Sequence, residues 1–530
     1  MTVPRWLRSP RWLALLAGAL PVLSFPALNL EWLAWFGLVP GLLVIVRAGT
    51  VREGGVRGWW FGTGFLIAAL YWMAPEIGPA VILIGAVCGV LWVPYGIAAW
   101  KLLRLEPGQT LSWRRALAAL VVVPSCWLLL EWIRSWQALG GPWEVLGASQ
   151  WQHPAILALG AVGGVWLISW ALVASNIAIT MVLLTRRVCV TAGIGVAVLV
   201  AVIGAGPLAF ALTPPFATVR QATVALVQPG IINNPVARAN ASESLTAKFS
   251  QGGSLGGVRP DLIVWGESSL PDSLFLDKPL LRQIEALSAK DGAEILVNQD
   301  ATPPGQGHEK WAVLVSANGI KGTYIKTRLV PFGEYIPFRQ QLGWLTKISK
   351  AASSNMVPGT GAHLLNATDR AGQPLPIGVL ICFEVAFPDM ARVDAEKGAQ
   401  LIVYQTETST FQGTWGPDQA ASLGAVRAAE TGRPVVQTAL TGVSVAFDAR
   451  GRELVRMGQS DHGVLTVRLD LPAGADRTLY DQWGDYVPWT SIAIVVLWAL
   501  TGLVRSGAIR RRAGAGGDRT AQYAEGHAVP

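Results

Sequence analysis

The chain has 530 residues, of which 52% are hydrophobic and only 14% are charged, and 24 of them are tryptophan. This composition is too apolar for an ordinary soluble protein, and it predicts a chain embedded in a membrane. The formal net charge is +8, but Lys and Arg occur in short clusters between apolar segments. Membrane topology therefore explains the charge better than nucleic-acid binding does. The four cysteines show neither a disulfide framework nor metal-ligand spacing, and no cofactor is indicated.

Apolar segments of about 17 to 30 residues, each long enough to cross a bilayer, fill the first 212 residues. Arg5, Arg8 and Arg11 precede the first segment, as in a secretory signal. Because further apolar segments follow at once, we interpret it as a membrane span instead. One more segment lies close to the C-terminus. The predicted spans are 11–28, 31–47, 57–76, 79–104, 114–136, 155–184, 188–212 and 487–504.

The charges between these spans predict how the chain crosses the membrane. Lys and Arg concentrate in alternate loops, and the intervening loops near 29–30, 77–78 and 137–154 contain none. Since loops rich in Lys and Arg stay in the cytoplasm, the N-terminus is expected inside. The predicted division is a transmembrane domain of seven helices at 1–212, an extracytoplasmic domain at 213–486, an eighth helix at 487–505 and a cytoplasmic, disordered tail at 506–530.

Three features of the membrane part favour structural roles. Glu131 and Arg134 lie one helical turn apart and predict a local ion pair, although ionisable residues within spans are also functional candidates. The aromatic-rich loop 140–154 predicts anchoring at the membrane interface, with a lipid entrance as the alternative. The glycine cluster within 160–164 predicts close packing between helices.

Residues 213–486 alternate short apolar runs with turns and helical patterns. Helices are expected near 275–290, 389–399 and 418–432. Strands alternating with helices predict a layered α/β domain, and about 270 residues can bury a core of their own. The predicted strands are 223–227, 262–265, 294–297, 312–315, 322–330, 377–382, 401–404 and 435–439, with a further β-rich stretch at 441–447.

Three of these strands carry residues that can form a nucleophilic site. One apolar strand stops at Cys382, another ends just before Glu267, and a third contains Lys326. A free cysteine is most often a small core residue, but a carboxylate and a cation on other strands change that interpretation. The carboxylate can accept the thiol proton, and the ammonium can stabilise an oxyanion together with the backbone N–H of Phe383. The set predicts acyl transfer through a thioester.

The order Glu, Lys, Cys resembles the nitrilase superfamily, and the string Leu329–Pro337 resembles its membrane branch, the apolipoprotein N-acyltransferase family. The resemblance covers almost the whole chain. It implies a multi-span α-helical membrane protein of about eight transmembrane helices with an inserted αββα sandwich. It also implies a location in the bacterial cytoplasmic membrane, with the catalytic domain on the periplasmic side.

The resemblance implies a two-step reaction at these three residues. Cys382 is expected to take an acyl chain from a membrane phospholipid, with Glu267 as the base and Lys326 holding the oxyanion. The acyl chain is then expected to pass to the α-amino group of the diacylglyceryl-modified cysteine of an apolipoprotein. Both partners come from the resemblance, whereas the residues alone indicate only a thioester-forming site beside a membrane.

Two further acidic residues receive supporting roles from the resemblance. Glu334 is expected either to cap a helix or to hold the catalytic set. Glu384 would oppose thiolate formation if it were close, so we expect a structural role and a cationic partner such as Arg427. Arg427 and Glu430 resemble an Arg-x-x-Glu pattern of the family, and a plain helical ion pair is the simpler interpretation.

The sequence also departs from the family pattern. Trp311-Ala312 stands where the family commonly has Asn, and the loop 406–419 lacks the usual Thr-Asn-x-x-Trp-Phe string. These departures concern acceptor or lipid selectivity and leave the catalytic set intact. Two alternative functions stay open at this point: a membrane-tethered amidase or nitrilase in which water resolves the thioester, and a non-catalytic membrane scaffold.

Overall fold

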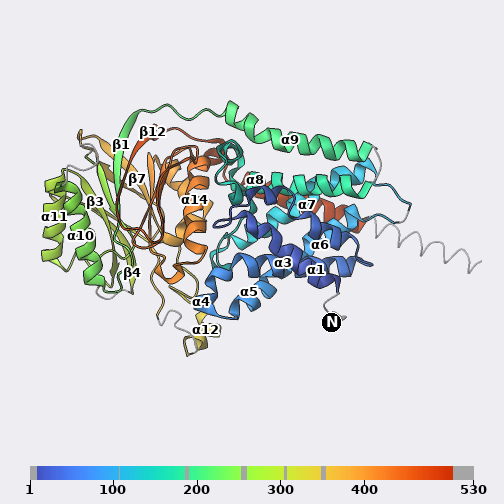
Figure 1. Ribbon diagram of the computed structural model, residues 1–530, viewed down its shortest axis with the longest axis horizontal. Coiled ribbons are helices and arrows are strands. Elements are labelled where there is room, and N and C mark those ends of the chain that lie inside the picture. Colours follow the sequence, from blue (N-terminus) through green and yellow to red (C-terminus); the bar gives the residue numbers. More distant parts are fainter. Residues whose placement is uncertain are drawn as a thin grey trace, which may run out of the picture.

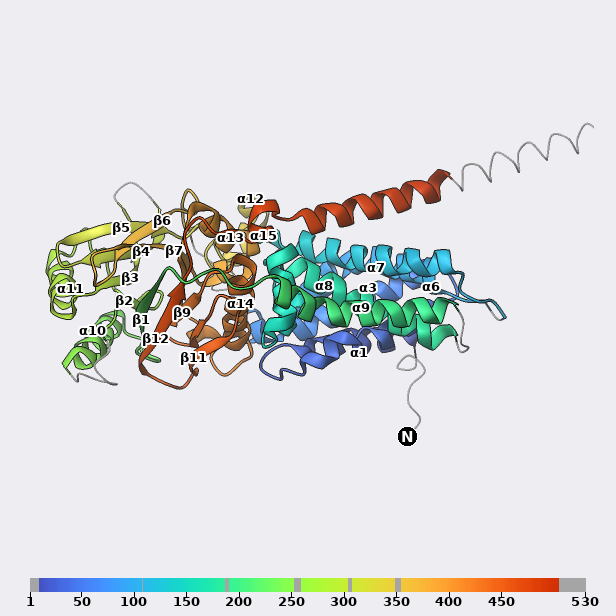
Figure 2. The ribbon, with the colours of Figure 1, turned by 90° about the horizontal axis from the view of Figure 1, so that it is seen from above.

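A helical bundle and an α/β domain form the two ends of an elongated molecule (Figure 1). The computed structural model describes residues 9–106, 108–185, 190–251, 259–303, 307–347 and 354–504. The helix Tyr486–Val504 returns from the α/β domain along the bundle, as seen from above in Figure 2. Trp489 of this helix packs edge to face on Trp132 of the bundle, with ring centroids 5.2 Å apart. The predicted tail 506–530 lies outside the described residues.

Long apolar helices dominate the bundle, as expected of a membrane protein. Five helices in the described chain are long and apolar enough to cross a membrane: Ala80–Leu103, Trp113–Arg134, Pro154–Thr185, Val190–Leu212 and Tyr486–Val504. Pro10–Ser24 and Glu31–Val46 are shorter apolar helices. The helices of the bundle are α1 (Pro10–Ala19), α2 (Val39–Val46), α3 (Val51–Ala69), α4 (Ala74–Ile77), α5 (Ala80–Gly89), α6 (Val93–Leu103), α7 (Trp113–Arg134), α8 (Pro154–Thr185) and α9 (Val190–Leu212).

The third helix begins earlier than the span predicted at 57–76. Thr50 lies in extended conformation and its hydroxyl accepts the N–H of Glu53, so it caps the first turn of α3. Arg57 then lies inside the helix, donates to Glu53 Oε1 at 3.2 Å and reaches the carbonyl of Val44 at 2.7 Å. The polar start of the helix is therefore satisfied by local partners, which a hydropathy argument does not detect.

The glycine cluster breaks α8 instead of simply packing against a neighbouring helix. Gly163 and Gly164 have non-helical dihedrals, and Gly164 has φ of 69°. A Cβ at Gly164 would lie 2.7 Å from the ring of Tyr480, so both the conformation and the close approach require glycine. Beyond the break, the N–H of Val165 donates to Glu430 Oε1 at 2.7 Å. The break thus fixes the bundle to the α/β domain.

Two six-stranded sheets form the α/β domain, with strand orders β12-β1-β2-β3-β4-β5 and β11-β10-β9-β8-β7-β6. Helices α10 and α11 cover one sheet and α14 lies over the other, between the sheets and the bundle (Figure 1). This arrangement is the layered α/β architecture predicted from the sequence. The strands are β1 (Arg220–Gln228), β2 (Leu262–Trp265), β3 (Glu294–Ala301), β4 (Glu309–Ser316), β5 (Gly319–Ile325), β6 (Leu364–Thr368), β7 (Pro374–Ile381), β8 (Leu401–Thr406), β9 (Val435–Ala439), β10 (Ser444–Phe447), β11 (Glu453–Met457) and β12 (Gly463–Leu471).

Several elements differ from the sequence prediction. The strand predicted at 322–330 ends at Ile325, because the N–H groups of Thr327 and Arg328 donate to the side chain of Glu384 and no longer to a neighbouring strand. The predicted strand 377–382 ends at Ile381. The unpredicted strands and α-helices are β6, β11, β12, α10 (Pro235–Gln251), α12 (Arg339–Leu342) and α15 (Leu479–Trp483), while the predicted helices are α11 (Lys278–Asp291), α13 (Pro388–Lys397) and α14 (Gly416–Thr431).

The segments after α3 and between α7 and α8 meet the α/β domain. Trp72 packs edge to face on Phe411, with centroids 4.9 Å apart, and Tyr71 packs on Trp415 at 4.6 Å. Both partners belong to the loop 406–419, where the sequence departs from the family pattern. That loop therefore rests on the helical bundle.

Candidate active site

Cys382 is the first residue of a short 3₁₀ helix, Cys382–Ala386, that follows β7 directly. Its φ is +50°, an unusual backbone conformation for a residue other than glycine. Such conformations cost free energy and persist where the surrounding structure enforces them, often at functional sites. The turn keeps the thiol half-buried at the end of the strand, and the next N–H, that of Phe383, lies in the first helical turn, where intrahelical acceptors are lacking.

Glu267 reaches the same place from β2 of the other sheet. Gly266 before it comes so close to β9 that a Cβ there would lie 2.0 Å from the backbone nitrogen of Leu440, so only glycine fits. The N–H of Glu267 donates to the carbonyl of Thr406 at 3.3 Å, which joins the ends of the two sheets. Glu267 is 3% exposed and lies close enough to Cys382 for each to shift the pKa of the other, while Cys382 Sγ lies 4.0 Å from the carbonyl of Glu407.

Lys326 follows β5 and lies between two carboxylates. Its Nζ is 3.2 Å from Glu267 Oε1 and 2.6 Å from Glu334 Oε1, and the residue is 1% exposed. The second oxygen of Glu334 accepts the N–H of Val330 at 2.8 Å, which fixes the carboxylate in the turn. Glu334 therefore holds Lys326 in place. Of the two roles expected for Glu334, its contacts fit this one and not the capping of a helix.

A second lysine, Lys310 on β4, contacts the same carboxylate. Its Nζ lies 3.1 Å from Glu267 Oε1, 3.3 Å from Asp300 Oδ1 and 2.9 Å from Ser268 Oγ. Sequence reasoning missed this residue because a charged residue within an alternating strand normally faces solvent. One signal was available, since Lys310 lies next to Trp311, where the sequence departs from the family pattern.

The charges of these residues shift one another's protonation. Burial opposes ionisation of Glu267, but Lys310 and Lys326 outweigh it and lower the pKa of Glu267 to about 2. Burial and the negative charge of Glu267 raise the pKa of the Cys382 thiol to about 12, against the opposing effect of Lys326. The pKa of Lys326 lies above its usual value because its two carboxylate partners outweigh burial. In the resting site, the thiol of Cys382 is therefore neutral. The carboxylate of Glu267 beside it is ionised and contacts the ammonium groups of both Lys310 and Lys326.

Glu384 orders the backbone around the site without contacting the thiol. One of its oxygens accepts the N–H groups of Thr327 and Arg328 at 2.7 and 2.9 Å and the hydroxyl of Tyr324 at 2.8 Å. The other oxygen accepts the N–H of Ile381 at 2.7 Å. This carboxylate therefore joins the residues after β5 to the end of β7, so it holds the segments that carry the lysine and the cysteine.

The expected pairing of Glu384 with Arg427 is wrong. Arg427 Nη1 lies 3.1 Å from Glu430 Oε2 on its own helix, and both residues are almost fully buried. Four donors from backbone and tyrosine groups take the place of a cation at Glu384. The helical spacing of Arg427 and Glu430 thus predicted the correct partner of Arg427. The partners of Glu384 lie far away in the sequence or on the backbone, so no local pattern indicates them.

The predicted ion pair between Glu131 and Arg134 is also wrong within the described residues. Glu131 Oε1 instead accepts the backbone N–H of Leu146 at 2.8 Å and the indole N–H of Trp127 at 2.7 Å, and Arg134 donates to the carbonyl of Trp143 at 2.7 Å. Both residues therefore hold the loop between α7 and α8. A helical spacing argument cannot detect this, because the loop partners lie outside the helix.

That loop lies against the residues that follow the cysteine. The ring of Trp143 is 6.2 Å from that of Phe383, and a Cβ at Gly141 would lie 3.0 Å from the rings of Phe383 and Phe387. Gln137 of the same connection donates to the carbonyl of Leu329 at 2.8 Å. The connection between two long apolar helices of the bundle therefore contacts the cysteine turn directly.

No group of His, Cys, Asp and Glu suited to hold a metal ion occurs in the part of the chain that the structure describes. The chemistry that this arrangement supports comes from its own side chains: a thiol, a carboxylate within hydrogen-bonding reach and a fixed ammonium. Together these groups can form and resolve a thioester.

Comparisons with known proteins agree with this arrangement. Residues 17–178 match the family model described as the apolipoprotein N-acyltransferase N-terminal domain, and residues 261–476 match carbon-nitrogen hydrolase. The chain is 29% identical to apolipoprotein N-acyltransferase of Chlorobaculum tepidum over 94% of this chain and 98% of that protein. It is 30% identical to the protein of the same name from Allorhizobium ampelinum over 86% of this chain and 85% of that protein. The chain therefore belongs to the apolipoprotein N-acyltransferase family.

Proposed function

We propose that the chain transfers an acyl chain from a membrane phospholipid to the α-amino group of the lipidated N-terminal cysteine of apolipoproteins. The observation that carries this proposal is the joint placement of Glu267, Lys326 and Cys382 at the ends of three strands, in a domain that rests on long apolar helices. The name shared by these relatives, which the chain matches over 98% and 85% of their length, supports the same reaction.

The first step moves the acyl chain to the enzyme. Glu267 accepts the proton of the Cys382 thiol as the sulfur attacks the ester carbonyl carbon of the phospholipid. The new C–S bond leaves the negative charge on the carbonyl oxygen, where the Lys326 ammonium and the N–H of Phe383 stabilise it. The ester C–O bond then breaks, and the departing lysophospholipid oxygen takes the proton from Glu267.

The second step moves the acyl chain to the acceptor. The α-amino group of the apolipoprotein attacks the thioester carbonyl, and Glu267 accepts a proton from that amine. As the tetrahedral intermediate collapses, the C–N bond stays, the C–S bond breaks and the Cys382 sulfur regains its proton. The same carboxylate and ammonium serve both steps, which is the basis of a ping-pong reaction.

The proposed membrane placement puts the α/β domain outside the cytoplasm. It combines the predicted divisions 1–212, 213–486, 487–505 and 506–530 with about eight spans in the bacterial cytoplasmic membrane. Exposed aromatic rings support a lipid-facing site: Trp136 is 58% exposed and packs on Phe338, which is 62% exposed, while Trp344 is 56% exposed. These rings would meet acyl chains that approach from the bilayer.

An amidase is a weaker explanation. Only residues 261–476 match carbon-nitrogen hydrolase, whereas the acyltransferase N-terminal domain matches at 17–178. An enzyme that acts on a soluble substrate would also have no need for its cysteine turn to contact the proposed membrane-spanning part. In this chain, Trp143 and Gly141 of that part pack against the turn.

The proposal is tested by incubating purified protein with phospholipid and a peptide that carries a diacylglyceryl-modified N-terminal cysteine. The expected product is the peptide with one added acyl group in an amide bond, which resists hydroxylamine. Cys382→Ala should abolish the product, and Cys88→Ala serves as the matched cysteine control. Release of free fatty acid at the full rate without any acylated peptide would instead indicate a hydrolase.

A further inference from the structure

Three arginines surround a pocket at the end of α9, away from the residues of the candidate active site. The pocket has a volume of 320 Å³, at the small end of the range for ligand sites. Arg450 and Arg452 come from the turn between β10 and β11, and Arg468 comes from β12. Pro215 and Phe216, in the connection from α9 to β1, complete the wall. We call this site the arginine pocket.

Two of the guanidinium groups share one aromatic ring. Arg450 Cζ lies 3.9 Å from the ring centroid of Phe210, and Arg452 Cζ lies 5.8 Å from it. Burial, followed by the positive charge of Arg452, lowers the pKa of Arg450. Arg450 also donates to the carbonyl of Thr213 at 2.8 Å, which fixes it at the end of α9. Like charges held this close favour an anion between them.

The acidic residues of the pocket do not supply that anion. Asp448 Oδ1 accepts the backbone N–H groups of Arg450 and Arg452 at 2.8 and 2.9 Å, and Asp470 Oδ1 accepts the side chain of Gln221 at 2.7 Å. In the described chain, neither carboxylate forms an ion pair with an arginine of the pocket. The side chains of Arg452 and Arg468 are exposed and make no hydrogen bond there.

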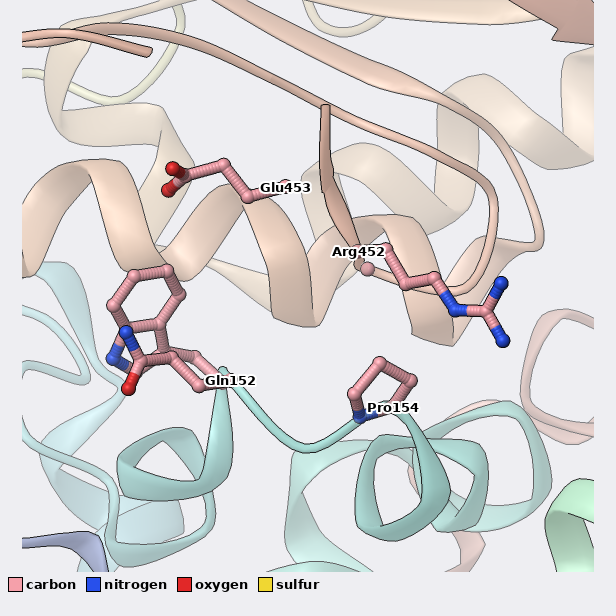
Figure 3. A pocket seen from close by; sticks show the side chains of 6 residues that line it. Gln152, Pro154, Arg452 and Glu453 are labelled. Carbon is pink, nitrogen blue, oxygen red and sulfur yellow. The ribbon is translucent and has the colours of Figure 1, made fainter. Parts of the chain in front are cut away.

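The position of the pocket selects the kind of anion. Phe210 belongs to the last turn of α9, an apolar helix long enough to cross a membrane. Leu208 and Leu212, two residues before and after Phe210 on this helix, are 59% and 71% exposed, so the end of α9 offers an apolar surface. A second hollow of 240 Å³ is lined by Arg452 and by Gly451 of the turn between β10 and β11, and Figure 3 shows Arg452 and Glu453 above Gln152 and Pro154 of the helical bundle.

We propose that the arginine pocket binds the phosphate group of an anionic phospholipid, with the acyl chains of that lipid lying along α9. Arginine matches phosphate oxygens with paired N–H groups, and basic residues near a membrane surface attract anionic lipids. None of the pocket residues belongs to the candidate catalytic set, so this lipid is neither the acyl donor nor the acceptor. It anchors the α/β domain to the membrane surface beside the end of α9.

The inference rests on the proposed membrane placement but not on acyl transfer, so the two can fail separately. The test titrates the purified full-length protein in detergent with phosphatidylglycerol and, separately, with phosphatidylcholine of the same chains, and counts bound lipids by native mass spectrometry. The double variant Arg452→Gln, Arg468→Gln should bind phosphatidylglycerol about 30-fold more weakly than the wild type, because each lost surface arginine weakens such binding about fivefold. Binding of phosphatidylcholine should not change.

Controls separate this site from general effects of charge. Arg259→Gln removes an exposed arginine outside the pocket, and it should bind phosphatidylglycerol as the wild type does. Arg468→Gln alone should weaken binding about fivefold and serves if the double variant does not fold. The double variant should still form the acyl-enzyme.

Three results would overturn the proposal. The first is equal phosphatidylglycerol binding by the wild type and the double variant, and the second is equal wild-type binding of the two lipids. The third is displacement of bound phosphatidylglycerol by millimolar inorganic phosphate, together with equally strong binding of phosphate when no lipid is present. That result would indicate a site for a free anion.

Discussion

Lys310 and Glu267 form a buried ion pair at 3.1 Å, on the same carboxylate oxygen that Lys326 contacts at 3.2 Å. With Glu334 and Asp300 included, three carboxylates and two ammonium groups surround the thiol. The negative charge of a thiolate or an oxyanion therefore adds to a site that already holds one carboxylate more than it holds ammonium groups. Without Lys310, that excess would be two negative charges before the reaction begins, and each intermediate would add another.

Lys310→Met should slow formation of the acyl-enzyme about 10- to 100-fold, the effect of one charge several Å away at an effective dielectric constant of about 20. It should also raise the pKa of Glu267, because Lys310 is the stronger of the two cations that lower it. The acid limb of the acylation rate should therefore move to higher pH. Both effects are measured as the rate of acyl-enzyme formation, followed in samples quenched at set times between pH 3 and 8.

Lys321→Met is the matched control for that variant. Lys321 lies on β5 and pairs with Glu294 at 2.8 Å, outside the candidate site, and its side chain is 31% exposed. It should leave the rate and the acid limb unchanged. If Lys310→Met behaves like Lys321→Met, the second lysine has no part in the charge balance of the site.

Alkylation of Cys382 should be slow at neutral pH and rise with pH, because burial and the carboxylate of Glu267 raise the pKa of its thiol to about 12. Glu267→Gln removes that negative charge, so it should lower the pKa and speed alkylation by iodoacetamide at pH 9. The same variant should lose acylation of Cys382 by phospholipid, since no base remains. Slower alkylation in Glu267→Gln would show that Glu267 does not oppose thiolate formation.

Glu384→Ala should lower the stability of the protein by about 3 kcal/mol or more, because four buried donors lose their acceptor. The change is measured as a decrease in the apparent Tm from tryptophan fluorescence. Tyr324→Phe removes one of the four donors and should cost only about 1 to 2 kcal/mol. Glu396→Ala removes an exposed helical ion pair with Arg392 and should change stability by about 0.5 kcal/mol at most. Equal values for Glu384→Ala and Glu396→Ala would contradict the role assigned to Glu384.

Asp481 gives a pH dependence of stability at the junction of the two parts. Burial raises the pKa of this carboxyl to about 7, against hydrogen bonds from Thr478. Because the folded-state pKa lies above the ordinary value of 3.8, the stabilising contribution is complete below that value and is lost as pH rises through about 7. Asp481→Asn keeps an acceptor for Thr478 without the charge, so its apparent Tm should exceed that of the wild type at pH 8 and match it at pH 4. The exposed Asp272→Asn is the control and should show no such difference.

The three residues of the candidate set could be predicted because each follows an apolar strand, a pattern visible in the sequence. Glu267 and Cys382 come from different sheets, and their meeting depends on the close approach at Gly266, which has no sequence signal beyond the glycine itself. Lys310 was missed since an ionisable residue within a strand normally faces solvent. It meets Glu267 only because β4 lies in the same sheet as β2.

The bundle shows the same limit of local reasoning. Hydropathy found the long apolar helices, including the last one, within a few residues. It did not detect that Gly163 and Gly164 break α8, because glycine pairs occur equally in continuous packed helices. Glu131 and Arg134 are likewise one turn apart, yet each holds the loop that follows rather than the other. Contacts between distant segments decide these features.

The most direct test of acyl transfer through Cys382 is intact-protein mass spectrometry after incubation with phospholipid alone, with Cys382→Ala in parallel. We expect the wild type to gain the mass of one acyl group and hydroxylamine to remove it, and we expect Cys382→Ala to gain none. A folded wild-type protein that gains no acyl group from accessible phospholipid, or an equal gain in Cys382→Ala, would contradict a thioester at Cys382 and with it the proposed acyl transfer.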